Sequence, residues 1–369
     1  MADSIIWVDF NTMEKFMADV FIGLGVPPED ALVCSKVLIE ADKRGIDSHG
    51  INRLKPIYYD RIKEGIQEPI TNFEIVRETP TTAVIDGHNG MGHVVGVRAM
   101  QAAINKAKKF GMGMTVVRNS THYGIAGYYA TMACDADMIG ITGTNARPSI
   151  APTFGIENML GTNPLVFGMP TDESFPFCID CATSITQRGK IEIYARTGKS
   201  LPEGWVIRSD GAPGLDSKLT LKELIDGSAA LAPLGGIGEE LAGYKGYGYA
   251  TVVEILSAAL AGGSFLKMLS GYDSEGKKIP YSLGHFFMAI DISNFIEPIL
   301  FKKTAGDILR ALRSSERAPD AERIYTAGEK EYETWLERKD KGVPLDKSLQ
   351  KEIRTMEKEL GIKGYNFPF

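Results

Sequence analysis

The chain lacks several features that would confine it to a narrow class of protein. Its 369 residues include only four cysteines, too few for a disulfide scaffold, and this suits a reducing compartment, the cytoplasm. The net charge of −6 argues against nucleic acid or an anionic membrane as the main partner. The longest apolar stretch, residues 250–263, is interrupted by Glu254 and is too short to span a bilayer. Residues 1–10 contain Asp3 and Asp9 but no basic start or long apolar run, so we expect no secretory signal.

Patterns that bind metals are also scarce. The chain has five histidines and no H-x-H or H-E-x-x-H pattern, which argues against a metal hydrolase. Cys178 and Cys181 form a C-x-x-C within a stretch that reads as a buried strand. Residues three apart in a strand point to opposite faces, so we expect two small buried side chains and neither a metal site nor a redox pair.

The sequence does contain alternating helical and strand patterns. Apolar residues at helical spacing predict helices over residues 27–45, 53–63, 94–110, 124–136 and 245–262. Strand patterns cover residues 73–77, 82–86, 112–117, 138–144 and 285–291. The order strand, helix, strand over 112–144 suggests a parallel crossover with a ligand face at the strand ends. The stretch 329–358 is mostly polar and predicts a solvated surface layer.

These patterns predict an α/β (α+β) chain of two domains. Residues 73–291 would form a mixed-sheet domain, and residues 1–72 plus 292–369, from both chain ends, a second and mostly helical domain. The nearest match to a Rossmann fingerprint, Gly90 to Gly96, has G-x-G-x-x-x-G spacing and no acidic residue at the expected distance. We therefore expect a non-Rossmann fold and interpret these glycines as a tight turn into a helix.

Two of the five histidines lie in short polar segments, Ser48-His49-Gly50-Ile51-Asn52-Arg53 and Asn119-Ser120-Thr121-His122-Tyr123-Gly124. Oxidation of a 2-hydroxy acid needs such groups: an imidazole to move a proton and a guanidinium to hold a carboxylate. His122 falls at a predicted strand-to-helix turn, where backbone donors meet a ligand. A non-catalytic binding protein would not need both segments. We interpret His88, His93 and His285 as structural.

Four strings resemble the type-2 malate/L-lactate dehydrogenase family: residues 41–50, 119–129, 160–164 and 245–248. The resemblance runs from about residue 5 to about residue 335. That family also includes L-sulfolactate dehydrogenase, ureidoglycolate dehydrogenase, diketogulonate reductase and an imino-acid reductase. The resemblance implies NAD, or alternatively NADP, bound without a Rossmann fold. It also implies a homodimer in which a mixed-sheet cofactor domain lies beside a helical substrate and dimerisation domain.

The resemblance also implies roles for single residues. His122 matches the expected proton acceptor, with His49 as a rival, and Arg53 matches the arginine expected on the substrate carboxylate. Ser48 belongs to the substrate motif. Tyr58 matches a substrate-side tyrosine, although a one-residue insertion near Pro56 leaves the neighbouring Tyr59 open.

The implied cofactor contacts are Asn145, Ala146, Asp180, Cys181, Ala182, Thr183, Ser184, Thr186, Lys245, Gly328, Glu329 and Lys330. Two departures from the family pattern affect this set: Ala327 replaces a usual proline, and residues 233–245 are longer than the usual connection. No metal ion is expected.

Malate and oxaloacetate are the first expectation for the substrate. Lactate, sulfolactate, ureidoglycolate and a cyclic imino acid are the alternatives. A dicarboxylate needs a second cation besides Arg53, and the candidates from the sequence are Arg147, Arg188 and Lys190.

Overall fold

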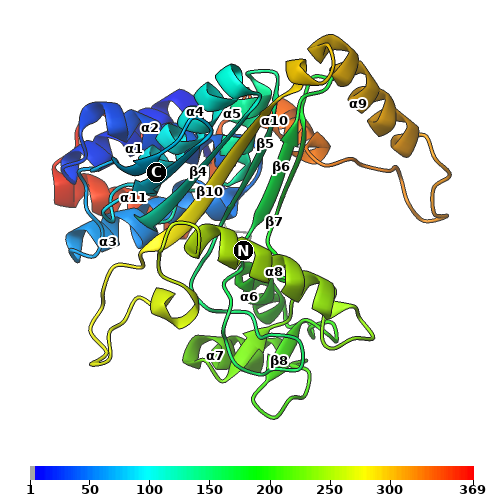
Figure 1. Cartoon of the computed structure of the whole chain (residues 1–369). Coiled ribbons are helices and arrows are strands. Elements are labelled where there is room, and N and C mark those ends of the chain that lie inside the picture. Colours follow the sequence, from blue (N-terminus) through cyan, green and yellow to red (C-terminus); the bar gives the residue numbers. More distant parts are fainter. Residues whose placement is uncertain (1–4) are drawn as a thin grey trace.

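The computed structural model describes residues 5–369 and has a seven-stranded mixed sheet at its centre (Figure 1). In spatial order the strands are β2 (Glu74–Glu78), β3 (Thr82–Asp86), β4 (Met112–Ser120), β10 (Leu283–Asp291), β5 (Met138–Thr144), β6 (Leu165–Met169) and β7 (Phe177–Cys181). Only β3 and β4 pair in parallel, and all the other neighbours are antiparallel. The expected mixed sheet is therefore confirmed.

The crossover predicted over residues 112–144 has an additional strand within it. β4 and β5 run in the same direction, but β10 lies between them and is antiparallel to both. The directly paired parallel crossover is the preceding one, in which α4 (Gly92–Phe110) connects β3 to β4. The predicted parallel crossover is confirmed, and β10, which arrives from far along the chain, lies between its two strands.

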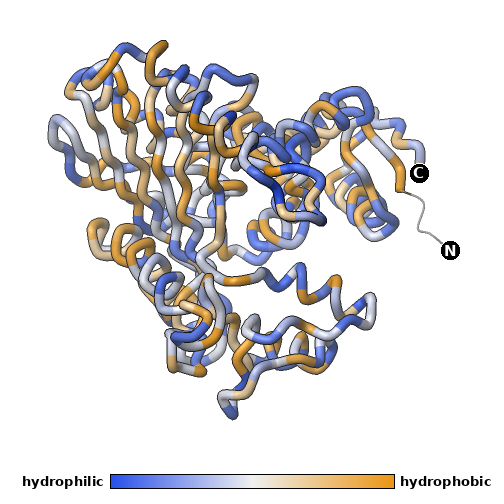
Figure 2. Tube along the Cα trace, turned by 90° about the vertical axis from the view of Figure 1, so that its right-hand side faces the viewer, coloured by the Kyte–Doolittle hydropathy of each residue, from blue (hydrophilic) through white to orange (hydrophobic). Residues whose placement is uncertain are grey.

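Helices cover both faces of the sheet. Val117 and Phe287 pack with α4 and with α5 (Gly127–Cys134), whereas their neighbours Val116 and Phe286 pack with Val253 of α8 (Gly243–Ala258). Consecutive strand residues point to opposite faces, so α4 and α5 lie on one side and α8 on the other. Figure 2 shows the apolar residues concentrated along the strands of this layered body.

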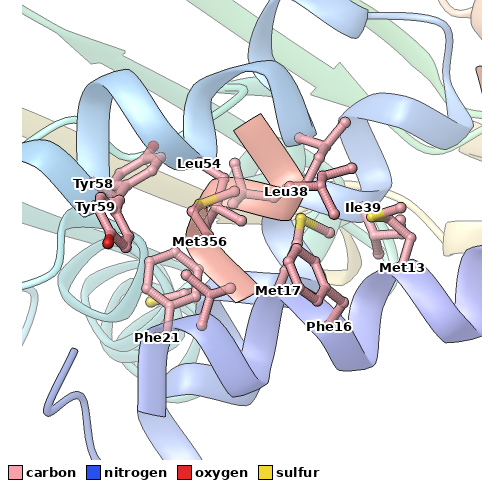
Figure 3. Packing of buried hydrophobic residues seen from close by; sticks show 14 of the residues in the cluster. Met13, Phe16, Met17, Phe21, Leu38, Ile39, Leu54, Tyr58, Tyr59 and Met356 are labelled. Atoms are coloured by element: carbon pink, nitrogen blue, oxygen red, sulfur yellow. The ribbon is translucent and has the colours of Figure 1, made fainter. Parts of the chain in front are cut away.

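Both ends of the chain build one helical core. It combines α1 (Phe10–Gly23), α2 (Pro28–Lys43) and α11 (Lys347–Leu360), and Met13, Phe16, Leu38 and Met356 meet inside it (Figure 3). A short antiparallel pair, β1 (Ile6–Val8) with β11 (Val343–Leu345), also joins the two ends. The prediction of a solvated layer over 329–358 was therefore wrong for α11, which buries Leu349, Ile353 and Met356 at helical spacing.

The remaining elements form a small lobe and a projecting arm. The lobe contains α6 (Arg188–Thr197), β8 (Val206–Arg208), α7 (Ser217–Asp226) and β9 (Ala229–Leu231) around its own apolar cluster. In Figure 1 α9 (Pro298–Arg313) extends away from the sheet, before α10 (Glu329–Arg338) returns to the helical core. No helix within residues 5–369 combines the length and apolar character that a bilayer crossing requires.

The C-x-x-C pair lies on an edge strand. β7 pairs only with β6, and both cysteines are half-buried free thiols, so the prediction of a buried strand was wrong. Cys178 packs against the cluster under α5. Within residues 5–369 no group of three or more histidine, cysteine or acidic side chains is arranged to hold a metal ion.

Candidate active site

A buried carboxylate shapes the Ser-His-Gly turn. After α2 the chain forms two short 3-10 turns, Asp47–His49 and Ile51–Arg53. The fully buried Asp42 accepts a 2.9 Å hydrogen bond from the backbone N–H of Ile51. A Cβ atom on Gly50 would lie 1.9 Å from Oδ1 of Asp42, so only glycine allows this approach. The turn that carries His49 is therefore packed onto the end of α2.

The next segment contains a π-helical turn, Leu54–Tyr59, followed by α3 (Asp60–Lys63). The helix predicted over 53–63 is confirmed as a helical segment, but it is π-helical over its first part and α-helical only from Asp60. The turn directs Tyr58 to His122, with 2.5 Å between Oη and Nδ1. The Tyr59 hydroxyl instead donates to Glu359 at 2.6 Å. Figure 3 shows the two rings side by side at the edge of the helical core.

His122 lies in the turn between β4 and α5, and α5 begins at Gly127 rather than at the predicted Gly124 because this turn occupies the intervening residues. The first residue of α4, Gly92, packs against it. A Cβ atom on Gly92 would lie 2.3 Å from the carbonyl oxygen of Thr121 and 2.5 Å from that of His122. The Gly92 N–H also donates to Thr121 Oγ1 at 2.9 Å. Of the glycines predicted to form the turn before this helix, Gly90 does precede it, whereas Gly92 and Gly96 lie inside α4, where Gly92 supports the His122 backbone.

The structure brings the two predicted histidines together. The His49 and His122 rings stack with centroids 5.8 Å apart and an angle of 22° between their planes. Ser48 Oγ lies 2.9 Å from His49 Nδ1. Arg53 Nε donates to the Ser48 carbonyl at 2.5 Å, which ties the arginine to the same turn. Together with Tyr58, all five predicted substrate-side residues therefore lie in one cluster.

Both imidazoles are held in their neutral form. His122 as a whole residue is half-buried, yet burial of its imidazole is the main cause that lowers its pKa well below the ordinary value. The charges of His49, Arg61, His93 and Arg53 lower the pKa of His122 further. Burial, followed by the charge of Arg53, lowers the pKa of His49 to about 4.

Two contacts surround Nδ1 of His122. The backbone N–H of Gly124 lies 3.3 Å from Nδ1 and donates to it when Nδ1 is unprotonated. The shorter contact, 2.5 Å to Tyr58 Oη, fits either direction, so in the tautomer with the proton on Nδ1 the imidazole donates to Tyr58 and Nε2 has a free lone pair. Nε2 has no hydrogen-bond partner among the described residues and is the nitrogen available to a ligand.

A cavity of about 360 Å³ is lined by residues that flank the two histidine turns, although neither histidine is part of its wall. Its wall includes Ile46, just before the His49 turn, and Ile125, just after His122. It extends to Asp180 on β7 and to Gly328 at the start of α10. Asp180 accepts a 2.6 Å hydrogen bond from the N–H of Gly127. A Cβ on Gly328 would lie 2.6 Å from the Pro176 carbonyl, so the glycine lets α10 approach β7.

A buried network fixes the turn at Asn145 and Ala146. The Asn145 side chain accepts from the Gly284 N–H at 2.7 Å, and the Ala146 N–H donates to Asn163 Oδ1 at 3.1 Å. The buried Glu254 of α8 accepts from Asn163 at 2.8 Å. Burial raises the pKa of Glu254, and these hydrogen bonds oppose that rise. The network was not predicted, because its members are separated widely along the chain.

The stretch 183–186 offers free donors. Thr183 is engaged with the carbonyls of Thr162 and Asn163. The hydroxyls of Ser184 and Thr186 are buried and have no hydrogen-bond partner within residues 5–369. Buried hydroxyls are normally satisfied, so these two fit the polar groups of a bound ligand. Cys181 and Ala182 precede them and are partly exposed.

Three of the predicted cofactor residues lie outside this arrangement. Lys245 is exposed in the first turn of α8, beside the ring of Tyr244. Glu329 is buried, but its carboxylate is already paired with Arg313 and Arg323. Lys330 is exposed, with Nζ 4.5 Å from the centre of the Tyr325 ring.

The candidate second cations differ in position. Arg188 is exposed and paired with Glu192, and Lys190 lies over the Trp205 ring in the small lobe. Arg147 is exposed, and its charge acts on Arg61. Arg61 was missed from the sequence. Its spacing of three residues from Tyr58, which places both on one helical face, was the available signal.

Comparison with known proteins agrees with this geometry. The profile of the family described as Malate/L-lactate dehydrogenase matches residues 8–354. The malate dehydrogenase of Pyrococcus horikoshii is 43% identical over 362 residues, which cover 98% of each chain. The L-sulfolactate dehydrogenase of Methanocaldococcus jannaschii is 38% identical over 349 residues, covering 95% of this chain and 96% of that one. The crystal structure of malate dehydrogenase from Entamoeba histolytica superposes with a TM-score of 0.94 at 45% identity, covering 99% of this chain and 100% of the other.

The family match spans nearly all of the helical core and the sheet, and both histidine segments lie inside it. The chain therefore belongs to the malate/L-lactate dehydrogenase family and is a dehydrogenase of 2-hydroxy acids.

Proposed function

We propose that the protein interconverts malate and oxaloacetate, with NAD as the hydride carrier. The observation that carries this proposal is the neutral His122, which is hydrogen-bonded to Tyr58 and stacked on His49. The nearby Arg53 and Arg61 have no carboxylate partner in residues 5–369, unlike the paired Arg98 and Arg118. The full-length similarity to malate dehydrogenases supports malate as the first substrate. Lactate, sulfolactate, ureidoglycolate and a cyclic imino acid are the alternatives that an assay must include.

In the oxidation of malate, His122 is the proton acceptor. A nicotinamide would supply the hydride acceptor when bound. As the C–H hydrogen leaves with its electron pair, the hydroxyl proton passes to His122 Nε2 and the carbon–oxygen double bond forms. Tyr58 orients the imidazole through Nδ1. Arg53 holds the carboxylate beside the reacting carbon, which fixes the face that the hydride leaves.

Substrate charge links the two directions of the reaction. In the empty site, Arg61 and Arg53 both lower the pKa of His122, which favours the neutral base needed for oxidation. A bound dianion offsets those charges and raises the pKa of His122. The same residue can then be protonated and donate to the carbonyl oxygen of oxaloacetate during reduction.

The cavity lined by Ile46, Asp180 and Gly328 would hold part of the cofactor. Ser184 and Thr186 offer unpartnered hydroxyls, and the fixed turn at Asn145 and Ala146 offers backbone groups. The remaining proposed contacts are Asp180, Cys181, Ala182, Thr183, Lys245, Gly328, Glu329 and Lys330.

The charges in the cavity favour NAD over NADP. Its wall contains two cations, Lys43 and Arg44, and both lie within ion-pair distance of Glu40. Its acids are Glu40, Asp135, Asp180 and Glu331. Carboxylates suit the hydroxyls of a ribose, whereas a 2′-phosphate would need Arg44 free of Glu40.

We further propose a homodimer in the cytoplasm. On α8 the side chains of Tyr249, Val252 and Ile255 are 55%, 46% and 55% exposed, which is a large apolar face for a free surface. A second copy of this chain is the simplest cover for it. The free thiols suit a reducing compartment. Residues 73–291 would serve as the cofactor domain, and 1–72 with 292–369 as the substrate and dimerisation domain.

The test is the absorbance of reduced nicotinamide with purified protein and a panel of keto acids. We expect oxaloacetate to be reduced faster than pyruvate, with NADH preferred to NADPH. The exposed His88, paired with Glu74, provides a control: His88→Ala should retain the activity. Cofactor binding without turnover of any keto acid would reject this substrate class and favour an imine or ureido substrate.

A further inference from the structure

Arg61 is an enclosed cation without an anion. It belongs to α3, three residues beyond Tyr58, and burial lowers its pKa from the ordinary value. No hydrogen bond or ion pair joins it to any carboxylate within residues 5–369. Other partly buried arginines are paired, as Arg118 is with Asp86 and Arg338 with Asp47. Leaving a guanidinium enclosed without a partner costs free energy unless a ligand supplies the missing charge.

An aromatic ring holds Arg61 in place. Its guanidinium lies over the ring of Tyr281, with the central carbon 4.3 Å from the ring centre. Tyr281 comes from the segment that leads into β10, and Lys278 of that segment forms an ion pair with Glu64, just after α3, at 2.8 Å. Stacking occupies the flat face of a guanidinium but leaves its N–H edges free for a planar anion.

Arg61 and Arg53 approach the reacting histidine from the same segment. They are separated by the π-helical turn that presents Tyr58. The charge of Arg61 acts on His122 and on Tyr58 more strongly than the charge of Arg53 does. Arg147 adds a third positive charge near Arg61. The substrate side of the site is therefore suited to more than one negative charge.

We propose that Arg61 binds the distal acidic group of a substrate that has two acidic groups, while Arg53 binds the carboxylate beside the reacting carbon. This inference rests on the proposed function and identifies the residue that would select a dianion. The distal group can be a carboxylate or a sulfonate, because both present oxygens of a single negative charge to a guanidinium. Arg61 is in this role a specificity residue, and the proton still moves to and from His122.

The experiment compares kcat/KM for oxaloacetate, sulfopyruvate and pyruvate in the wild type and in Arg61→Gln. Removing one partner of a buried charge pair should lower kcat/KM for the two diacids about 100-fold or more. Pyruvate has no distal acid, so its kcat/KM should change by less than about threefold on the same reasoning. The larger loss among the two diacids shows whether a carboxylate or a sulfonate is the natural distal group.

Three further variants make the comparison specific. Arg61→Lys keeps the positive charge but loses the two-pronged hydrogen-bond geometry of the guanidinium. Its kcat/KM for diacids should therefore lie between the values of the wild type and Arg61→Gln. Tyr281→Leu removes the stacking surface and should also weaken diacids selectively. Arg188→Gln, in the small lobe, should change none of the substrates. Equal losses for pyruvate and oxaloacetate in Arg61→Gln would overturn the proposal, since Arg61 would then act only by supporting Tyr58.

A binding measurement separates this proposal from the proposed function. With NAD present, malate should protect the wild type against thermal unfolding more than lactate does, and Arg61→Gln should lose that preference. If no keto acid is turned over but the preference for malate is present and depends on Arg61, the proposed reaction is wrong and the anion site stands. If malate and lactate protect the wild type equally against thermal unfolding, the proposed anion site is wrong.

Discussion

His49 and His122 face each other from two regions that are built in different ways. His49 lies on a 3-10 turn of the helical core, where the turn follows the buried carboxylate of Asp42. His122 lies on a turn that follows strand β4 of the sheet, and Gly92 at the start of α4 packs against the backbone of this turn. Neither region contains both imidazoles, so the site is complete only when the helical core packs against the sheet.

The difference also separates the chemical roles. The Nδ1 side of His122 contacts the Tyr58 hydroxyl and the Gly124 N–H, which leaves Nε2 facing the substrate. His49 is paired through Nδ1 with the adjacent Ser48 hydroxyl and carries no comparable set of contacts. A histidine held by two partners at one nitrogen suits proton transfer at the other nitrogen, and a histidine held only by its own turn suits orientation of the substrate.

Replacing His122 or His49 should have the largest effect on activity and should separate their two roles. His122→Ala should lower kcat for malate oxidation by about 10³–10⁴-fold, because the proton acceptor is lost. His49→Ala should cost about 10–100-fold, since it removes orientation and not the acceptor. Both variants should bind the cofactor as the wild type does, as measured by quenching of nicotinamide fluorescence. A larger loss of kcat in His49→Ala than in His122→Ala would make His49 the proton acceptor and His122 the orienting residue.

Gly50→Ala tests the helical side of the site alone. The new Cβ would meet the Asp42 carboxylate at 1.9 Å, so we expect a loss of about 1–3 kcal/mol in the free energy of unfolding, together with reduced activity. The matched control is Gly189→Ala in α6, where a Cβ meets no atom within 4 Å. That variant should be neutral or more stable by up to about 1 kcal/mol. Equal stabilities in urea denaturation would show that the turn at Gly50 is not constrained.

Tyr58→Phe tests the contact that joins the two regions. Losing the hydroxyl that faces His122 Nδ1 should lower kcat for malate about 10-fold while leaving the KM for the cofactor unchanged. Tyr59→Phe is the control, because the Tyr59 hydroxyl bonds to Glu359 and should affect stability only. A decrease in kcat for Tyr59→Phe but not for Tyr58→Phe would show that Tyr59, and not Tyr58, contacts His122.

The pH profile gives the smallest expected effect. Oxidation needs neutral His122, and its pKa is lowered from 6.5, so the active form persists at pH values below 6.5. The kcat/KM for malate should therefore show no fall from His122 as the pH decreases to 6.5, and should fall at lower pH. Arg61→Gln removes one of the charges that lower this pKa, so the fall should move to higher pH. An unchanged profile in that variant would exclude Arg61 as a neighbour of His122.

Local sequence patterns were enough to predict the histidine segments, Arg53 and the main strands, because those features depend on contiguous residues. The order β4-β10-β5 depends on a strand that joins from residue 283 onward, which no local pattern reveals. The burial of α11 was also missed, because three apolar side chains in a charged helix carry its packing.

The choice between Tyr58 and Tyr59 required the backbone itself. A regular helix through Pro56 and the π-helical turn observed here place the two tyrosines differently, and the sequence fits both. In the sequence, Arg61 looks like an ordinary cation on the surface of a helix. Its enclosure becomes visible only when Tyr281, distant along the chain, covers it.

The central claim is that His122 waits as a neutral base and gains a proton when an acidic substrate offsets the nearby arginines. Nitrogen NMR of histidine-labelled protein tests it directly, since five imidazoles can be resolved and assigned by His→Gln variants. We expect a neutral His122 at pH 6.5 with the proton on Nδ1, shifting toward the doubly protonated form when a dicarboxylate binds. A His122 that is already protonated at pH 6.5 without ligand, or one that does not respond to the dicarboxylate, would contradict it.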